Sequence, residues 1–161
     1  MQVRRASADD AERCAEIYAP FVTDSWVSFE EQAPDTGEVA GRITTFGETH
    51  GWWIAEMSGT VAGYAYGSAH RSRTAYKASC EVAVYVDPAF SRQGVGSALY
   101  GRLLPALGKR GFHAAFAGIA LPNEASIALH EMFSFTPVGV YREVGWKLGS
   151  WRDVGWWQLL L

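Results

Sequence analysis

The stretch CEVAVYVDPAFSRQGVGSALYGRLL, residues 80–104, constrains the fold of this chain more than any other. Its apolar and aromatic first part predicts a strand over 77–86, which stops at Asp87-Pro88. A glycine-containing turn follows, and the leucines beyond it recur at helical spacing. The chain therefore places two glycines and an arginine at the junction of a strand and a helix.

This junction has the chemistry of an anion site. The N–H groups that open a helix have no partner within it, and the helix dipole makes that end positive. Gly94 and Gly96 would let phosphate oxygens approach where a Cβ would collide, and Arg92 adds a permanent positive charge. We therefore expect a pyrophosphate cradle here, although an ordinary helix N-terminus would also explain the pattern. The expected cradle comprises Arg92, Gln93, Gly94, Val95, Gly96 and Ser97.

Two common nucleotide-binding motifs do not fit the same stretch. The dinucleotide motif G-x-G-x-x-G requires a third glycine, and the chain has Leu99 at that position. A Walker A loop requires Gly-Lys-Ser/Thr, which does not follow. The cradle is therefore expected to belong to another class of fold.

The rest of the chain predicts an α+β fold in one domain, residues 1–161, with helices on the faces of one mostly antiparallel sheet. Pro105 lies within the helix that follows Gly94 and is expected to kink or shorten it. Two strands within 138–161, joined by a polar, glycine-containing loop, are expected to close the chain. The other expected strands are 2–7, 52–56, 60–69, 77–86 and 113–119, and the other expected helices are 7–21, 35–47 and 123–133.

Composition argues against several classes of protein. The chain has 161 residues, of which 48% are hydrophobic and 19% charged, as in ordinary globular domains. A net charge of -3 does not indicate a nucleic-acid binder. The N-terminus has no apolar signal core, and no run of about 18 apolar residues indicates a membrane span. Cys14 and Cys80 lack metal-ligand spacing, so we expect a reduced, cytoplasmic protein without a metal site.

The strand, the Asp-Pro turn, the Arg-x-Gly-x-Gly and the helix resemble the acetyl-CoA site of the GNAT superfamily of N-acetyltransferases. The resemblance implies the GNAT fold, a mixed, mostly antiparallel sheet of about seven strands with about four helices on its faces. It also implies that the strand backbone pairs with the pantetheine arm of acetyl-CoA. The chain has Ser91 where Gln or Arg is usual, which leaves Arg92 to neutralise the pyrophosphate. The residues that the resemblance assigns to the arm are Val84, Tyr85, Val86, Asn123 and Ser126.

Three further motifs resemble a narrower group, the phosphinothricin acetyltransferases and the related methionine sulfone and sulfoximine acetyltransferases. They are RSRTAYKASCEVAVYV, ALPNEASIALHE and GWKLGSWRDVGWWQ. Enzymes of this group acetylate the α-amino group of small amino-acid-like acceptors. The resemblance therefore implies transfer of an acetyl group from acetyl-CoA directly to such an amine.

Glu81 is the first candidate catalytic residue. Strand alternation puts Glu81, Ala83 and Tyr85 on one face, and a carboxylate among apolar neighbours is costly without a purpose. A buried salt bridge is one explanation. The resemblance implies the other, because Glu81 matches the catalytic glutamate, a general base that deprotonates the acceptor ammonium. Alternation points Cys80 away from Glu81, so Cys80 is not expected to carry an acyl group.

His130, on the expected helix 123–133, is the second candidate. A lone helical histidine often has a structural role. The phosphinothricin group carries a histidine here, which implies that His130 protonates the departing CoA thiolate or acts as a second base beside Glu81. The usual glycine after this helix is Ser134, so the turn there is expected to differ slightly.

An acceptor site is implied on the loop before the strand 77–86. Two arginines two positions apart can bind a carboxylate or phosphinate, although arginines are also common in solvated loops. The resemblance assigns the acidic end of the acceptor to them, with Arg71 in place of the usual lysine. Phe29 and Tyr85 match wall positions of the acceptor pocket, or they are ordinary core residues. The implied acceptor residues are Phe29, Arg71, Arg73, Tyr76 and Tyr85.

The final hairpin is implied to form a homodimer and to line the partner's active site. Lys147, Trp151 and Asp153 are its matching residues. Trp146, Trp151, Trp156 and Trp157 together would be many rings for one monomer surface, and a dimer interface would bury them. A tight hairpin with exposed aromatic residues is the alternative.

Two other functions remain open on the same sequence. A protein or peptide N-acetyltransferase would need an open groove, against which Arg71 and Arg73 argue. A non-catalytic acyl-CoA-binding module could lose its acid–base residues, and the chain retains both Glu81 and His130. No nucleic-acid or membrane partner is expected.

Overall fold

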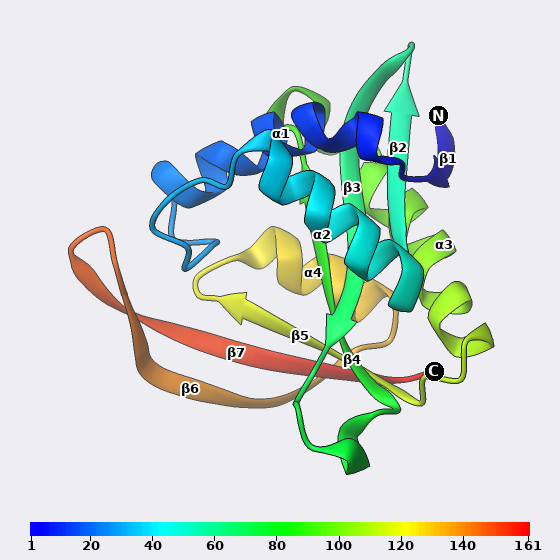
Figure 1. Ribbon diagram of the computed structural model, residues 1–161. Coiled ribbons are helices and arrows are strands. Elements are labelled where there is room, and N and C mark those ends of the chain that lie inside the picture. Colours follow the sequence, from blue (N-terminus) through cyan, green and yellow to red (C-terminus); the bar gives the residue numbers. More distant parts are fainter.

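A seven-stranded sheet in the order β1-β2-β3-β4-β5-β7-β6 forms the centre of the computed structural model, which describes residues 1–161 (Figure 1). Only β4 and β5 are parallel neighbours, and every other pair is antiparallel. The expected mixed, mostly antiparallel sheet is confirmed. Its strands are β1 (Gln2–Arg5), β2 (Trp52–Met57), β3 (Thr60–Ala69), β4 (Ser79–Val86), β5 (Ala114–Ala120), β6 (Thr136–Lys147) and β7 (Ser150–Leu160).

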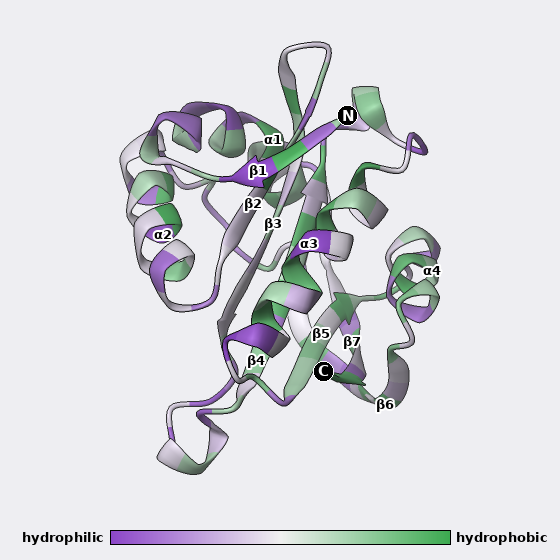
Figure 2. Ribbon diagram, turned by 90° about the vertical axis from the view of Figure 1, so that its right-hand side faces the viewer, coloured by the Kyte–Doolittle hydropathy of each residue, from purple (hydrophilic) through white to green (hydrophobic).

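Four helices cover the two faces of this sheet, as the sequence predicts. They are α1 (Ala11–Thr23), α2 (Thr36–Thr49), α3 (Val95–Lys109) and α4 (Glu124–Met132). Helices α1 and α2 lie on one face and α3 and α4 on the other, so each face has its own apolar core (Figure 2). Successive side chains of β3 and β4 point alternately into these two cores. Tyr64 and Tyr85 face α1, while Ala65 and Cys80 face α3. None of these helices has the length and apolarity that a membrane crossing requires.

Pro105 does not shorten its helix, which was one of the two effects expected of it. Helix α3 continues through Pro105 to Lys109. A proline inside a helix costs about 3 kcal/mol. The leucines around it, Leu103, Leu104 and Leu107, are all buried, and each contributes about 1.5–3 kcal/mol. Packing against the sheet therefore outweighs the lost hydrogen bond.

Strands β4 and β5 pair over only three positions and then separate. Their register runs from Ser79↔Ala114 to Glu81↔Phe116. Beyond Glu81, the β5-facing edge of β4 has no strand partner, while its other edge stays paired with β3 up to Val86. A gap in the middle of the sheet therefore exposes backbone groups that a ligand can reach.

The final hairpin is longer and its turn tighter than the sequence predicts. Strands β6 and β7 are joined by two residues, Leu148 and Gly149, both with positive φ, at 50° and 72°. Such a two-residue turn suits the twist of antiparallel strands, so no polar loop is needed. Strand β6 forms the edge of the sheet, and nearly all of its residues are exposed.

Candidate active site

A cavity of about 480 Å³, here called the large cavity, opens on the α1 and α2 face of the sheet. Its walls come from the segment after α1, from β3, β4 and β5, and from the hairpin. Eleven of its 16 lining residues are hydrophobic, and Glu81 and Arg71 are the only charged ones. The lining residues are Val27, Ser28, Phe29, Tyr66, Ser68, Arg71, Glu81, Val82, Ala83, Tyr85, Gly118, Ala120, Tyr141, Val144, Val154 and Trp156.

Glu81 lies at the point where β4 and β5 begin to separate. Its cross-strand neighbour on β3 is Ser68, and both side chains reach the large cavity. Its carboxylate has one partner in the chain, since Oε1 lies 3.0 Å from Nδ1 of His70. The sequence analysis did not identify His70. The alternation Tyr66, Ser68, His70 was the available signal, because it continues the cavity face of β3 past the end of the strand.

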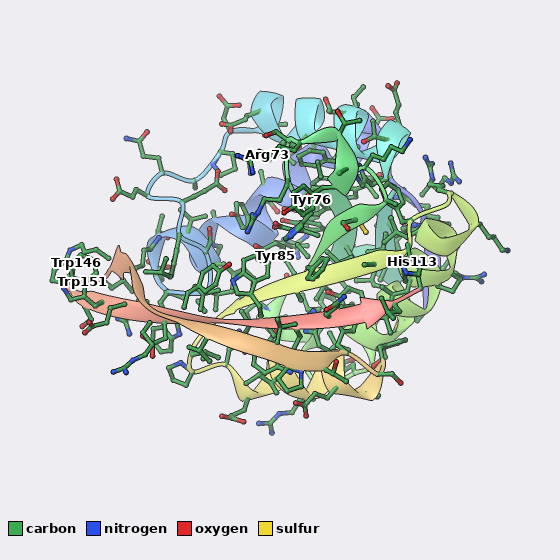
Figure 3. The ribbon with its side chains drawn as sticks, turned by 90° about the horizontal axis from the view of Figure 1, so that it is seen from below. Arg73, Tyr76, Tyr85, His113, Trp146 and Trp151 are labelled. Atoms are coloured by element: carbon green, nitrogen blue, oxygen red, sulfur yellow. The ribbon has the colours of Figure 1, made fainter.

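The loop between β3 and β4 separates the two predicted arginines. Arg71 lines the large cavity, whereas Arg73 and Tyr76 are exposed and do not contribute to its walls. Arg73 and Tyr76 lie close together on this loop, where the Tyr76 N–H donates to the Arg73 carbonyl at 2.9 Å; both are labelled in Figure 3. The structure therefore brings only one of the two arginines to the cavity that contains Glu81.

Phe29 lies in the segment between α1 and α2, which forms one wall of the large cavity. A network around Glu30 fixes this segment, since its carboxylate accepts hydrogen bonds from the Tyr18 hydroxyl and the Arg42 guanidinium. The hydrogen bond from Arg42 is the main cause that lowers the pKa of Glu30. The carboxylate therefore stays ionised and holds the wall in place.

Lys147 connects the hairpin to the same segment. It is buried, and its ammonium donates to the carbonyls of Val22, at 2.6 Å, and Glu30. The Val22 carbonyl belongs to the last turn of α1, where a positive charge is favourable. The resemblance had placed Lys147 in a hairpin that lines a partner's site, and the structure uses it within its own chain.

Tyr85 lines the large cavity and also belongs to an aromatic cluster. Its ring centroid lies 4.8 Å from that of Tyr18 and 5.5 Å from that of Tyr64. Burial raises the pKa of Tyr85 well above its usual value, so its hydroxyl stays protonated. The ring therefore serves as a neutral wall.

A second, narrower cavity occupies the space between β4 and β5 and is here called the strand gap. Six residues line both the strand gap and the large cavity, so the two are neighbours. At its far wall, Asn123 caps α4 by accepting a hydrogen bond from the Ser126 N–H at 3.2 Å. The lining residues are Val27, Val82, Ala83, Val84, Tyr85, Ala117, Gly118, Ile119, Ala120, Asn123, Ser126 and His130.

His130 lines the strand gap and does not contribute to the large cavity. Its Nδ1 lies 2.7 Å from the Ser126 carbonyl, which can only accept, so Nδ1 carries the hydrogen. Its Nε2 lies 2.8 Å from the hydroxyl of Tyr100, a core residue that the sequence analysis did not single out. Burial lowers the pKa of His130, which favours the neutral imidazole. Glu81 and His130 therefore occupy adjacent cavities.

The N-terminus of α3 has free donors, as an anion site requires. The N–H groups of residues 93–97 make no hydrogen bond within the chain. Gly94 has φ 79°, a left-handed conformation that glycine adopts without strain. Gly96 also has a packing reason that the sequence did not reveal, because a Cβ there would lie 2.9 Å from Cδ2 of Leu129. Gly96 therefore leaves room for the Leu129 side chain of α4 beside the first turn of α3.

The four hairpin tryptophans do not form one surface, contrary to the sequence analysis. Trp157 is buried in the α3 core, and Trp156 lines the large cavity, because successive residues of β7 point to opposite faces. Trp146 and Trp151 are 58% and 59% exposed and lie together at the hairpin tip (Figure 3). Asp153 accepts a hydrogen bond from the Glu143 N–H at 2.7 Å and so holds β6 against β7.

The sequence of this chain is similar to those of known acetyltransferases. The sequence profile of the Acetyltransferase (GNAT) family matches residues 11–135. The phosphinothricin N-acetyltransferase of Streptomyces viridochromogenes is 35% identical over 158 residues, which cover 98% of this chain and 86% of that protein. The L-methionine sulfoximine/L-methionine sulfone acetyltransferase of Salmonella typhimurium is 32% identical over 165 residues, which cover 100% of this chain and 95% of that protein.

A solved structure shows the same fold. The GNAT superfamily phosphinothricin acetyltransferase from Sinorhizobium meliloti, in complex with acetyl-CoA, superimposes with a TM-score of 0.95 at 34% sequence identity. The superposition covers 99% of this chain and 88% of that one. The superposed part of this chain thus includes the residues that line both cavities and the N-terminus of α3.

Proposed function

The chain belongs to the GNAT family of acetyltransferases, and from this premise we propose that its acceptor is the α-amino group of a small amino-acid-like molecule such as phosphinothricin, methionine sulfoximine or methionine sulfone. The enzyme is an N-acetyltransferase with acetyl-CoA as its co-substrate. The observation that carries the acceptor proposal is that one carboxylate, Glu81, and one guanidinium, Arg71, line the same largely apolar cavity. An amino acid offers an ammonium to the first and an acidic group to the second.

Acetyl-CoA would bind along β4 and α3. The free N–H groups of residues 93–97, with Arg92 beside them, suit its pyrophosphate. The strand gap suits the pantetheine arm, because the backbone of Val84–Val86 lacks a strand partner on that side. Asn123 and Ser126 on the opposite wall offer polar contacts to the same arm. The acetyl group would then lie where the strand gap meets the large cavity.

Glu81 is the general base of this proposal. An ammonium ion has no lone pair, so one proton must move from the acceptor to the Glu81 carboxylate before attack. The amine nitrogen then bonds to the thioester carbonyl carbon, while a backbone N–H of β4 stabilises the developing oxyanion. The C–S bond breaks, the nitrogen loses its second proton as the amide forms, and the CoA thiolate takes up one proton. His130, which lines the strand gap, or a water molecule there would relay that proton from the nitrogen to the sulfur.

The hairpin would form the interface of a homodimer. Eight of the twelve exposed large hydrophobic residues lie on β6, β7 and their turn. A long, exposed edge strand such as β6 readily pairs with another chain. Both cysteines, Cys14 and Cys80, are free and buried, and a cytoplasmic location would keep them reduced.

The test is release of free thiol from acetyl-CoA with a panel of acceptors. The panel comprises phosphinothricin, methionine sulfoximine, methionine sulfone, common L-amino acids, polyamines and a lysine peptide. We expect efficient turnover with one of the first three, and loss of that turnover in Glu81→Gln with acetyl-CoA still bound. Glu48→Gln serves as the matched control, because Glu48 is exposed and its side chain makes no hydrogen bond; Arg110 binds only its backbone carbonyl.

Other outcomes of this assay would point to a different acceptor or to a protein without catalytic activity. Turnover only with the peptide or a polyamine would overturn the amino-acid acceptor. Acetyl-CoA binding without turnover on any amine would favour a non-catalytic acyl-CoA-binding module.

A further inference from the structure

His70 lies directly after the last residue of β3, on the strand face that points into the large cavity. The side chains of Ser68 and His70 project from the same face, and Ser68 is the cross-strand neighbour of Glu81. His70 is therefore placed diagonally across the strand pair from Glu81. This geometry brings its Nδ1 to 3.0 Å from Oε1 of the carboxylate.

The hydrogen on Nδ1 follows from the chemistry of the pair. An ionised carboxylate can only accept hydrogen bonds, so His70 must donate through Nδ1. Oε2 of Glu81 has no hydrogen-bond partner in the chain and is left to the large cavity. One oxygen is therefore held while the other remains available to an acceptor.

The imidazole ring is fixed by its neighbours. It stacks on Phe116, with ring centroids 4.4 Å apart and an interplanar angle of 11°. The rings of Tyr76 and Trp156 approach it edge-on, at 6.0 and 6.1 Å. The His70 side chain is only 11% exposed, compared with 33% for that of Glu81. A mostly covered ring, packed between other rings, therefore holds the more exposed carboxylate.

We propose that His70 is the positioning residue of Glu81: it holds Oε1 so that Oε2 faces the acceptor amine. This inference rests on the proposed function, in which Glu81 accepts the ammonium proton. Without the Nδ1 donor, the glutamate side chain would rotate among its rotamers, and the fraction of enzyme with Oε2 aimed at the amine would fall. His70 itself touches neither the acceptor nor acetyl-CoA in this arrangement.

Three substitutions of His70 separate its donor from its bulk. His70→Phe keeps a ring on Phe116 and removes the donor. His70→Asn returns an amide N–H near the position of Nδ1, while His70→Gln places it near Nε2, away from Glu81. We expect kcat to fall about 10- to 100-fold in His70→Phe and His70→Gln and to recover in His70→Asn, with an unchanged KM for acetyl-CoA.

His113→Phe is the matched control. His113 is exposed, its side chain has no hydrogen bond in the chain, and it lies far from Tyr85 and the large cavity (Figure 3). The kcat of the His113→Phe variant should equal that of the unsubstituted enzyme. Equal kcat values for His70→Asn and His70→Gln would overturn the proposal, because a purely structural role does not depend on where the donor lies.

A double-substitution cycle distinguishes this inference from the proposed function. If His70 acts through Glu81, His70→Phe should lower kcat in the native background and leave the residual kcat of Glu81→Gln unchanged. An equal loss in both backgrounds would overturn the positioning role alone. A fully active Glu81→Gln would overturn the base assignment and, with it, any positioning of that base.

Discussion

The ring of Phe29 lies against the backbone of Gly145, in the space that a Cβ at position 145 would occupy. Phe29 belongs to the segment after α1, and Gly145 belongs to β6, so this contact closes one wall of the large cavity. The glycine is thus needed for close packing, and its φ is not in the left-handed region.

Gly145→Ala should displace the Phe29 ring and reshape the acceptor wall. Overpacking of this kind costs about 1–3 kcal/mol, so we expect the acceptor KM to rise about tenfold. The KM for acetyl-CoA should not change, because the strand gap does not include either residue. Gly139→Ala is the control on the same strand, since a Cβ there would contact nothing. Equal kinetics for the two variants would contradict this account of the wall.

Arg71→Ala should raise the acceptor KM more than Arg73→Ala does. Arg71 lines the large cavity and Arg73 does not, although both match the same motif. Loss of a charged hydrogen bond costs about 1.5–3 kcal/mol, which predicts a rise of about 10- to 100-fold for Arg71→Ala. Steady-state kinetics with varied acceptor measure both effects. A larger effect of Arg73→Ala would mean that the loop rearranges when the acceptor binds.

The stability of the protein should fall on mild acidification. Burial lowers the pKa of His130, so between that lowered value and about 6.5 the unfolded chain binds more protons than the folded one. The contribution of His130 to the free energy of unfolding is therefore fully present above about pH 6.5. It declines as the pH falls through this window. Burial also lowers the pKa of His50, which adds to the decline with the same sign.

Urea unfolding at about pH 7.5 and about pH 5.5 measures this decline. In His130→Gln the difference between the two pH values should be smaller than in the unsubstituted protein. Asp10 and Glu30 do not confuse the comparison, because the lowered pKa of each places its titration at more acidic pH. An identical difference in both proteins would show that His130 gains no proton on unfolding in this range.

Removal of the two exposed tryptophans should weaken the proposed homodimer. Central interface tryptophans often contribute 2 kcal/mol or more, so Trp146→Ser with Trp151→Ser should raise the dimer Kd by about 30-fold or more. Sedimentation velocity across a range of protein concentrations measures this Kd. Met132→Ser is the control, because Met132 is equally exposed but lies at the end of α4. A monomer at every concentration in the unsubstituted protein would refute the dimer.

Elements with a clear local signal could be predicted from the sequence. The hairpin pattern predicted β3 with its observed bounds, and alternation put Glu81 and Tyr85 on one face of β4. Asn123 capped the expected helix, because its side chain competes for the first N–H groups wherever such a helix begins.

Features that depend on tertiary packing could not be predicted in the same way. Pro105 was overridden by the buried leucines around it, and the role of Gly96 depends on Leu129, which is distant in sequence. Trp157 was grouped with the surface rings, although only its position on β7 decides that it is buried. His70 was overlooked because its proximity to Glu81 depends on the register in which β3 and β4 pair, which the sequence does not show.

The two hydrogen bonds that the Lys147 ammonium donates connect the hairpin to the wall of the acceptor site. The edge strand that carries the proposed dimer surface also holds the carbonyls of Val22 and Glu30, next to Phe29 in the acceptor wall. In a homodimer, the same strand, β6, would therefore take part in both dimer assembly and acceptor binding. Acceptor affinity would then depend on enzyme concentration, so that dilution of the protein loosens the pocket without any change in its sequence or ligands.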